Sequence, residues 1–375
     1  MSETQQQRFK CAGCGGDMVF DPASGGLKCP YCGSKVAVPQ EESARPVQEN
    51  VLEDYLHAGP ERLAKLSAAA VQITCDSCGA TTTFEPTEVA GFCAFCGAKI
   101  VAQPVAADPL IAPEAVLPFQ VPNKQAVQAI KAWLSSRWFA PNALKSMARQ
   151  ESIQGVYLPF WTYDSSTVSD YVGQRGEHYW ETEYYTEQDE NGNTVRRERQ
   201  VQRTRWWPAS GRVSRDFDDV TIPATNSIDN YKLHALEPWD LNLLVPYTPG
   251  YLSGFKAQRY QVELGDGFDR ARNIMAGVIE GDVRSDIGGD EQQIHSVNTQ
   301  HFDVTFKHIL LPVWIAAYRF NSKVYQVVVN ARTGEVQGER PYSVWKILGL
   351  ILLILALILI FVAFQNSRPE ATFRH

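Results

Sequence analysis

The sequence predicts an α+β multidomain protein with two zinc ribbons, a β-rich α+β domain with a possible internal duplication, and one C-terminal transmembrane helix. Three observations carry this prediction. All eight cysteines fall into two units of equal spacing, residues 153–336 have the pattern of β-strands, and 18 consecutive apolar residues run from Ile347 to Phe364. The expected divisions are ribbon 1 at 8–40, a helical spacer at 41–71, ribbon 2 at 72–103, a proline-rich linker at 104–122, the β-rich domain at 123–340, the transmembrane helix at 344–364 and a short tail at 365–375.

The cysteines form the pattern CxxC-x14-CxxC twice. The first unit is Cys11, Cys14, Cys29 and Cys32, and the second is Cys75, Cys78, Cys93 and Cys96. A CxxC turn places two thiolates on one side of a metal ion, and a second turn closes the tetrahedron of a structural Zn²⁺ site. We therefore expect two structural zinc ions per chain, bound by these eight residues.

The two units are also repeats of each other outside their cysteines. A shift of 64 residues aligns Gly15 with Gly79 and Phe20 with Phe84. The glycine after each second cysteine permits a left-handed turn beside the sulfur atoms. Segments of this size bury too little surface to fold unaided, so metal binding worth about 10 to 16 kcal/mol is expected to be the main source of folding free energy. Both units resemble bacterial zinc ribbons.

Other roles of paired cysteines fit this sequence less well. A disulfide framework is typical of small secreted domains, but the chain starts with the polar segment MSETQQQRFK and no signal peptide. A redox CxxC is expected at the strand-to-helix turn of a βαβ unit, which neither unit resembles. Catalytic zinc is not expected, because four thiolates leave no coordination position for water.

Helices are expected between and after the ribbons. Val51–Ala58 and Pro60–Val71 have the pattern of two short helices that form a spacer. The prolines of the following linker exclude a regular helix and indicate extended chain. Asn123 is the expected N-cap of a helix whose apolar face includes Val127 and Leu134.

Two stretches of the β-rich domain resemble each other, Val156–Tyr163 (VYLPFWTY) and Leu310–Tyr318 (LLPVWIAAY). A helix is expected before each, the later one with Asp266 as its cap. This pattern suggests a duplicated helix-plus-sheet unit, with its proline at an edge or a bulge. The segment Lys323–Val336 is expected to form a hairpin with Asn330–Gly334 as the turn.

An acidic and aromatic stretch, residues 177–190, and an arginine-rich stretch, residues 196–215, flank Asn191-Gly192. Asn-Gly is a strong signal for a hairpin turn. The expected cross-strand pairs are Glu187 with Arg196, Tyr184 with Arg199, and Trp180 with Arg203. We favour a self-complementary hairpin over a nucleic-acid or lipid-headgroup site, because a paired arginine must lose its neighbour before it can bind a phosphate.

The apolar run Ile347–Phe364 predicts a membrane span. At 1.5 Å per residue it covers about 27 Å, close to the ~30 Å hydrocarbon core of a bilayer. Basic residues near its two ends are balanced, so we infer the orientation from the thiols, which need a reducing compartment to bind zinc. The expected localisation is the inner (cytoplasmic) membrane, single-pass and tail-anchored, with the N-terminal body in the cytoplasm.

Composition and motifs indicate no enzymatic activity. The net charge of -7 makes the chain a poor non-specific ligand for nucleic acid. The sequence has no GxxxxGK[ST] phosphate loop, no GxSxG elbow and no HExxH motif. The acidic pair Asp290-Glu291 and the histidines His301 and His308 are better explained as loop, surface or core residues. We therefore expect a protein that is not an enzyme.

The ribbons, the LPFW and LPVW segments, the VVVNARTGEV hairpin and the apolar C-terminal segment together resemble a family of bacterial double zinc-ribbon, tail-anchored membrane proteins. Its members are often labelled as relatives of the primosomal protein N′ (replication factor Y) helicase or as TFIIB-type zinc-ribbon proteins. Helicase activity is not carried over, because the phosphate loop is missing. The resemblance implies a link with membrane-stress modules that contain SPFH and PspA-like proteins.

Two functions are weighed on this basis. The first is a membrane-anchored adaptor that presents protein-binding modules on the cytoplasmic face. The alternative is a membrane-tethered, nucleic-acid-binding zinc-ribbon protein related to replication or transcription. Between Cys75 and Lys99, ribbon 2 carries one lysine against three carboxylates, whereas phosphate contacts need a basic face. Charge therefore favours the adaptor, with protein partners, and makes nucleic acid the less favoured partner.

Overall fold

The computed structural model describes residues 9–39, 47–56, 71–84, 90–101, 105–106, 111–136, 153–188, 193–320, 323–339 and 344–366. Three long strands dominate it: β11 (Ile153–Gln188), β12 (Thr194–Pro223) and β15 (Glu291–Phe320). They belong to a nine-stranded sheet whose main path is β12-β11-β15-β10-β13. The expected α+β class is wrong, because the described part of the chain is mostly β-strand, and most of it belongs to this one large sheet, whose long strands are antiparallel.

The shorter elements of this sheet sit around the long strands. They are β4 (Asn50–Val51), β10 (Ala115–Val116), β13 (Val245–Pro246), β14 (Lys256–Ala257), β16 (Lys323–Asn330) and β17 (Val336–Gly338). The helices are α1 (Leu52–Leu56), α2 (Asn123–Ser135), α4 (Asn230–His234), α5 (Leu264–Ile287) and α6 (Val344–Asn366), with 3-10 turns at Leu241–Leu243 and Pro249–Leu252.

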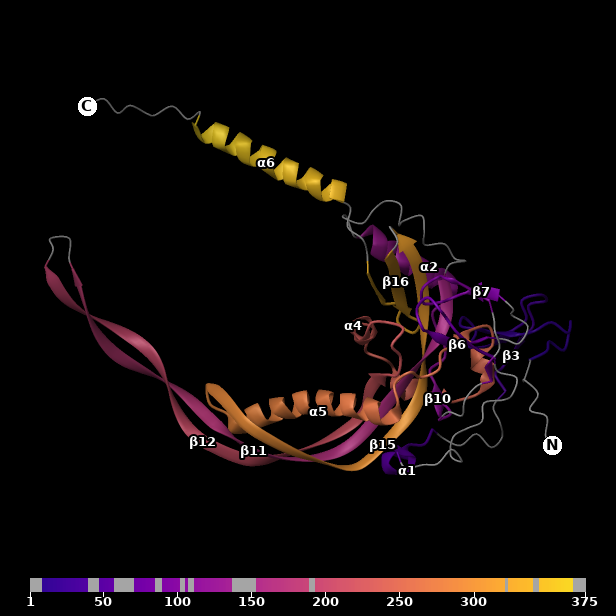
Figure 1. The fold of residues 1–375 in the computed structure, drawn as a ribbon, viewed down its shortest axis with the longest axis horizontal. Helices are drawn as coiled ribbons and strands as arrows, with labels where there is room; N and C mark the ends of the chain where they lie inside the picture. The colour runs from indigo at the N-terminus through magenta and orange to yellow at the C-terminus, as the bar shows by residue number, and fades with distance from the viewer. Residues whose placement is uncertain are drawn as a thin grey trace.

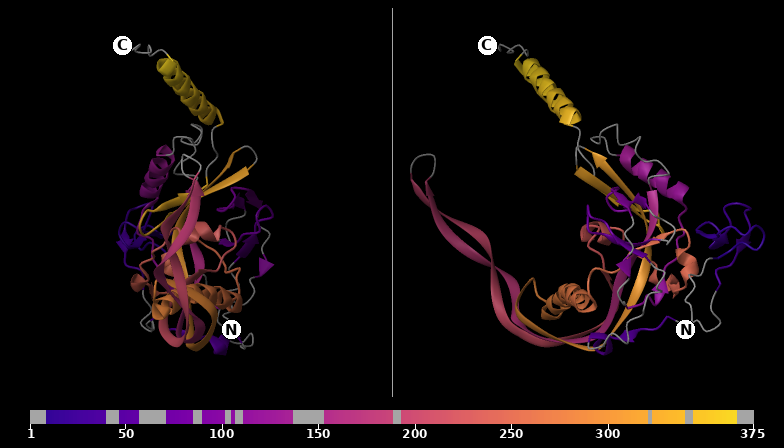
Figure 2. Two further views of the ribbon diagram at one scale, coloured as in Figure 1. Left: turned by 90° about the vertical axis from the view of Figure 1, so that its left-hand side faces the viewer. Right: turned by 45° about the vertical axis from the view of Figure 1, so that its right-hand side comes forward.

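The β11–β12 hairpin curves away from the rest of the chain, and α5 lies along the inner side of the curve (Figure 1). The third strand, β15, pairs with β11 only as far as Gly176, which faces Glu291. Beyond that point the hairpin continues as two strands alone. We call residues 177–188 and 194–205 the distal arm. The proximal sheet is the part near the ribbons, namely residues 153–163 of β11 and 306–316 of β15 with the short strands beside them (Figure 2).

The proximal sheet has a hydrophobic core on each face. Tyr157, Leu310 and Trp314 belong to one core cluster, whereas Leu158 and Leu311 belong to the other. Side chains of successive residues in a strand point to opposite faces, so these neighbours supply both cores. A sheet that is buried on both faces explains the nearly continuous apolar runs that the sequence shows around both Leu-Pro motifs.

The two similar stretches of the sequence lie side by side. Leu158 of β11 is paired with Leu311 of β15, and each strand's proline, Pro159 or Pro312, is one residue from that pair. Because the strands run antiparallel, the two Leu-Pro motifs are related by an approximate two-fold axis at the leucine pair. The two halves of the proximal sheet therefore meet through the same residues.

Two tryptophans, one in each long strand, obey the same approximate two-fold relation in their hydrogen bonds to the segments before α2 and α5. The Trp161 indole donates to the Val262 carbonyl over 2.9 Å, and the Trp314 indole donates to the Val121 carbonyl over 2.8 Å. Each carbonyl lies two residues before the first residue of a helix, α5 in one case and α2 in the other. Each long strand is thus tied to the helix that precedes the opposite strand.

The short strands β10 and β14 complete the pattern. Val116 in β10 pairs in parallel with Leu310, and Ala257 in β14 pairs in parallel with Tyr157. Both pairs place a two-residue strand beside a Leu-Pro motif. Val116 lies before Asn123, the first residue of α2, by the same number of positions as Ala257 lies before Leu264, the first residue of α5. The proximal sheet is therefore assembled from two units that make the same contacts.

Several local predictions can be compared with these elements. The helix at Asn123 is confirmed, and it buries Val127 and Leu134, although its N-cap is Pro122. The expected cap at Asp266 is wrong, because α5 begins at Leu264 and Asp266 lies within its first turn. The β16–β17 hairpin is confirmed, and a hydrogen bond of 2.8 Å from the Gly334 N–H to the Asn330 carbonyl closes its turn.

The arginine-rich hairpin is confirmed, but its predicted register is wrong by one residue. Glu183 faces Arg199, and Glu187 faces Val195 rather than Arg196. The turn at Asn191-Gly192 lies outside the described residues. A one-residue shift exchanges the two faces of a strand, so the glutamates lie on the same face as Arg199 and Arg203 instead of opposite Arg196.

The segments around ribbon 2 are described only in part. Of the expected spacer helices, the first appears as the shorter α1, and the second lies outside the described residues. Within the expected linker, Leu117 and Phe119 are fully buried beside β10. The end of that stretch is therefore part of the core of the sheet, because its apolar side chains fill both faces.

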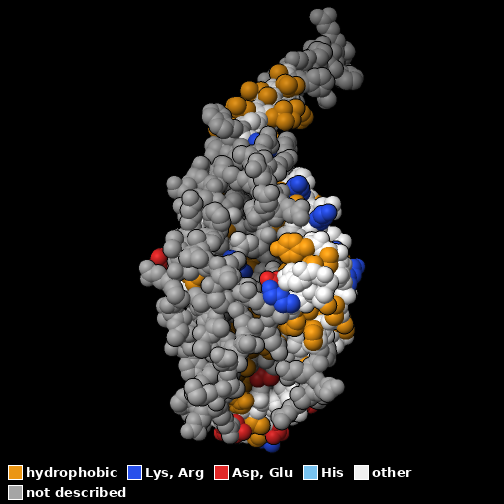
Figure 3. Space-filling model, turned by 90° about the vertical axis from the view of Figure 1, so that its right-hand side faces the viewer, with side chains coloured by type: hydrophobic (Ala, Val, Ile, Leu, Met, Phe, Trp, Pro, Cys, Tyr) orange, Lys and Arg blue, Asp and Glu red, His pale blue; other side chains and the backbone are white. Residues whose placement is uncertain are grey.

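The expected transmembrane helix and the single-pass membrane localisation are corrected by the structure. The described part of the chain contains no helix long and apolar enough to span a bilayer. The apolar surface of α6 is visible at one end of Figure 3.

Candidate metal centres

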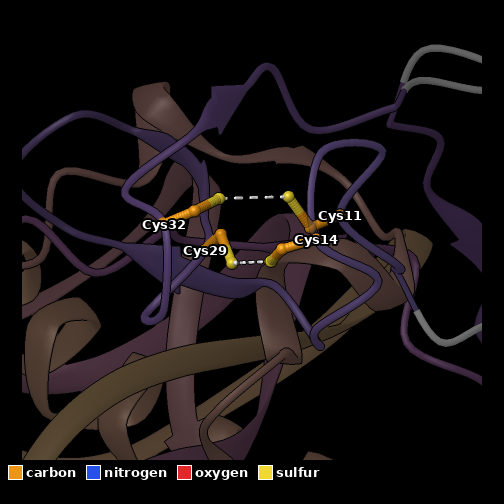
Figure 4. Close-up of side chains that lie close together, drawn as sticks. All are labelled: Cys11, Cys14, Cys29 and Cys32. Carbon is orange, nitrogen blue, oxygen red and sulfur yellow. Dashed lines mark hydrogen bonds between the residues drawn. The ribbon is translucent and has the colours of Figure 1, made fainter.

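Ribbon 1 brings its four cysteines together. Its sheet consists of β1 (Val19–Asp21), β2 (Gly26–Lys28) and β3 (Lys35–Val36). The Sγ atoms of Cys11 and Cys32 are 3.4 Å apart, as are those of Cys14 and Cys29. All four side chains converge on one point from two facing turns (Figure 4). The four residues predicted as one metal site therefore form one cluster.

Ribbon 2 repeats this arrangement. Its strands are β5 (Val71–Thr74), β6 (Thr81–Phe84), β7 (Ala90–Phe92), β8 (Lys99–Val101) and β9 (Val105–Ala106). The Sγ atoms of Cys75 and Cys96 are 3.6 Å apart, as are those of Cys78 and Cys93. The second predicted set of four is thus also one cluster.

The glycine after each CxxC shapes the turn beside the sulfurs. Gly15, Gly33, Gly79 and Gly97 all have positive φ angles, between 70° and 79°. In each turn the glycine N–H donates to the carbonyl of the first cysteine, for example over 2.8 Å from Gly15 to Cys11. A residue with a Cβ atom is strained in this conformation. The predicted left-handed turns are confirmed, and they aim both thiols of each pair inward.

The spacing of the sulfur atoms fits a tetrahedral zinc ion. A Zn–S distance of about 2.3 Å in a tetrahedron separates sulfurs by about 3.8 Å. The observed separations of 3.4 Å and 3.6 Å are slightly shorter, so a small outward movement would admit the ion. All ligand atoms of each group lie within 4.8 Å of one another. Each cluster is therefore a possible zinc site of the ribbon type.

The thiols of the two clusters differ in their surroundings. The Ser34 hydroxyl lies 3.2 Å from Sγ of Cys32 and lowers the pKa of that thiol to about 6. In ribbon 2, burial raises the pKa of Cys93 to about 11. Metal binding requires thiolates, so zinc must displace protons from the buried cluster.

Ribbon 1 is docked on one face of the proximal sheet. The Phe20 N–H donates to the Ser253 carbonyl over 2.9 Å, and the Ser253 hydroxyl donates to the Met18 carbonyl over 2.7 Å. The Phe20 ring packs edge-on against Tyr251 at 5.4 Å, and Cys11 and Cys29 share its core cluster. No sequence pattern marks Ser253 as a docking residue, because its role depends on tertiary contact.

Ribbon 2 is docked on the opposite face. The Gln326 amide donates to the Phe95 carbonyl over 2.6 Å, and Phe95 is fully buried. The cluster that contains Cys75 and Cys93 also contains Leu158 of β11. The sheet therefore lies between the two ribbons, and both metal centres are continuous with its hydrophobic core.

A third group of possible ligands is acidic and lies beside a buried lysine. Glu49, Asp164 and Asp218 lie close enough to share an ion. The Lys307 ammonium, however, is 3.0 Å from Glu49 and 3.7 Å from Asp164, and it is also 2.7 Å from Asp219. This buried lysine compensates the acidic charge, so we assign no metal to the group.

In the described part of the chain, the histidines His301 and His308 and the pair Asp290-Glu291 make contacts that stabilise the fold. His301 lies 3.2 Å from the Ser165 hydroxyl, but that serine is buried. His308 is buried, and this burial lowers its pKa to about 4. Asp290 and Glu291 bind the main chain and side chain of His178. These contacts have structural roles, and the absence of enzymatic activity stays a prediction.

The chain is similar to Uncharacterized protein YdjG of Bacillus subtilis (strain 168). The two are 26% identical over 350 residues, which are 90% of this chain and 91% of the relative. No family model matches the chain. No solved structure matches it. The likeness thus covers about nine tenths of each chain.

Proposed function

We propose that the chain binds two structural zinc ions, one in each four-cysteine cluster, and serves as a non-enzymatic scaffold for protein partners. The observation that carries the proposal is the position of the clusters. Each is brought together in space, and each is packed into one of the two cores of the proximal sheet. Zinc binding would therefore stabilise the sheet as well as the ribbon.

The role of zinc in this proposal is structural. Four thiolates fill the coordination shell, so the ion has no open position for a substrate or water. The ribbon strands are two to four residues long and bury little apolar surface without the ion. Phe20 contacts Tyr251, and the Phe95 carbonyl accepts a hydrogen bond from Gln326, so a ribbon held in place by zinc also stabilises the sheet residues that it contacts.

Protein partners fit the exposed surface better than nucleic acid does. Some arginines of the distal arm form ion pairs with glutamates, such as Arg199 with Glu183 at 2.6 Å and Arg203 with Glu181 at 2.9 Å. A phosphate would have to displace these carboxylates. The SPFH and PspA-like proteins that the sequence resemblance implies are the first partners to test.

Metal analysis of the purified protein, prepared under reducing conditions, tests the zinc proposal. We expect two zinc ions per chain, and loss of both, with unfolding of the ribbons, on treatment with a strong chelator. A chain that is folded and free of metal would refute the proposal.

Binding assays test the scaffold role separately. We expect the zinc-loaded protein to bind a purified SPFH or PspA-like protein, and a chelator to abolish that binding. Salt-sensitive binding of single-stranded DNA at micromolar concentration, without protein binding, would favour the nucleic-acid alternative instead.

A further inference from the structure

The distal arm has an unpaired strand edge. The third strand ends where Glu291 pairs with Gly176, and the Asp290 carboxylate then accepts the His178 N–H over 2.7 Å. From Tyr179 to Gln188, no described strand pairs with this side of β11. The edge therefore presents unpaired backbone groups over about ten residues.

The backbone N–H and C=O groups of successive residues in a strand point to alternate edges, so the residues whose groups face the open edge can be identified. The Gly176 carbonyl and the His178 N–H both point toward the third strand. Main-chain groups of alternate residues point the same way in an antiparallel strand, so those of Trp180, Thr182 and Tyr184 face the open edge. No described strand pairs with the outer edge of β12 either, but Pro208, which faces Gln174 just outside the arm, offers no N–H and limits how far another strand could pair along that edge.

The arm has little of its own to stabilise it. Helix α5 ends at Ile287, and the two strands continue beyond it without a third layer. An isolated two-stranded ribbon is marginally stable in water, whereas three or more strands are stable. Trp180 is 66% exposed and Tyr184 is 56% exposed. An unblocked edge with exposed aromatic side chains is suited to receive another strand.

We propose that two copies of this chain dimerise by antiparallel pairing of their β11 edges, with a two-fold axis at Glu183. The open edge runs from Tyr179 to Gln188, and an axis at Glu183 pairs residues 179–187 of the two copies, which is nearly the full edge. The result is a four-stranded sheet in the order β12-β11-β11-β12. The arms project away from the ribbons (Figures 1 and 2), so antiparallel arms keep the two bodies at opposite ends.

The side chains favour this register over its neighbours. It places Trp180 beside Thr186, Thr182 beside Tyr184, Glu181 beside Tyr185 and Tyr179 beside Glu187 of the partner subunit. If the axis lay at Thr182, Glu181 would face Glu183 of the other copy. If it lay at Tyr184, Glu181 would face Glu187 of the other copy. Aromatic and threonine pairs stabilise sheets, whereas opposed like charges destabilise them.

One like-charge contact remains at the axis, where Glu183 meets its own copy. The Arg199 guanidinium compensates it, because it donates two hydrogen bonds to the Glu183 carboxylate, of 2.8 Å and 2.6 Å. Each subunit therefore brings an already neutralised pair to the axis. This proposal is independent of the zinc proposal, since it involves only the arm.

Analytical ultracentrifugation of the full-length, zinc-loaded chain tests the proposal with two matched variants. Thr182→Pro removes an N–H from the open β11 edge, whereas Gln200→Pro removes one from the outer edge of β12. The two residues face each other, and both substitutions remove the same 2.8 Å side-chain hydrogen bond. We expect twice the 41.9 kDa chain mass for wild type and Gln200→Pro, and the single mass for Thr182→Pro. A monomeric wild type, or equal masses for the two variants, would overturn the proposal.

Disulfide trapping tests the position of the axis. Glu183→Cys is expected to form a covalent dimer on mild oxidation, because only the residue on the axis meets its own copy. Glu187→Cys lies on the same strand and face but about 27 Å from its copy, at 3.4 Å per residue. Covalent dimers of Glu187→Cys at the level of Glu183→Cys would show that the proposed register is wrong.

Discussion

The proximal sheet and the distal arm are parts of the same strands, yet different forces hold them. In the proximal sheet, β11 is covered on both faces, and Trp161 and Leu158 are fully buried. In the distal arm beyond His178, β12 is the only described strand that pairs with β11, and ion pairs and ring contacts line the surface, such as Arg196 over Tyr184 at 4.2 Å. The comparison shows that the strand's neighbours, rather than the strand itself, decide how stable each part is.

The largest expected effect concerns the ribbons that cover the proximal sheet. Replacing Cys75 and Cys78 together by serine should release one of the two zinc ions and unfold ribbon 2, because metal binding worth about 10 kcal/mol or more is lost. Ser77→Ala, an exposed change between the same ligands, should keep both ions. Metal content and the thermal midpoint are the measurements. A double variant that retains two zinc ions would disprove the assignment of ribbon 2.

The next effect compares one residue type in the two regions. Trp161→Ala should lower the free energy of unfolding by about 3 to 5 kcal/mol, because it opens a cavity and leaves the Val262 carbonyl unpaired. Trp180→Ala should cost less than about 1 kcal/mol, because Trp180, in the distal arm, is 66% exposed. Urea denaturation measures both. Equal costs would mean that the two regions are not held differently.

A smaller effect depends on pH. Burial raises the pKa of Glu114 to about 7, although the Asn50 amide and the His308 N–H donate to its carboxylate. A carboxyl whose pKa is raised by folding stabilises the protein fully below the unfolded pKa, near 4.5, and that stability is lost as pH rises through about 7. Wild type should therefore become less stable relative to Glu114→Gln at higher pH.

Urea denaturation of both proteins at pH 6 and pH 8 checks this prediction. We expect the stability difference to shift by about 1 kcal/mol in favour of Glu114→Gln. Zinc loss and the other titrating groups act on both proteins alike, so the comparison removes them. A pH-independent difference would show that Glu114 is ionised throughout the range.

The smallest effect is expected in the distal arm. Glu183→Gln removes the carboxylate that binds Arg199, and both side chains are largely exposed. Exposed ion pairs contribute about 0 to 1 kcal/mol and are screened by salt. The unfolding free energy should change within that range and the change should vanish at high salt. A decrease in the free energy of unfolding as large as that expected for Trp161→Ala would show that the arm is tightly packed.

Local sequence patterns predicted the features that depend on short spacing. The eight cysteines, their glycines and the β16–β17 turn all follow from residues a few positions apart, and the structure places them together. The register of the arginine-rich hairpin could not be predicted in the same way, because the number of loop residues around Asn191-Gly192 sets it.

Tertiary contacts explain the remaining differences. The fold class depends on how many strands join one sheet, and the crossed bonds of Trp161 and Trp314 join residues 101 and 193 positions apart. The docking of ribbon 1 through Ser253 spans 235 positions. Contacts of such separation leave no local pattern, so the sequence does not show that each ribbon is packed into one of the two cores of the sheet.

Hydrogen exchange with and without a zinc chelator tests the central claim most directly. If the two ribbons hold the proximal sheet from both faces, chelation should greatly increase exchange at 153–163 of β11 and 306–316 of β15, and should change the distal arm much less. Unchanged protection of those two segments after complete removal of zinc would contradict the account.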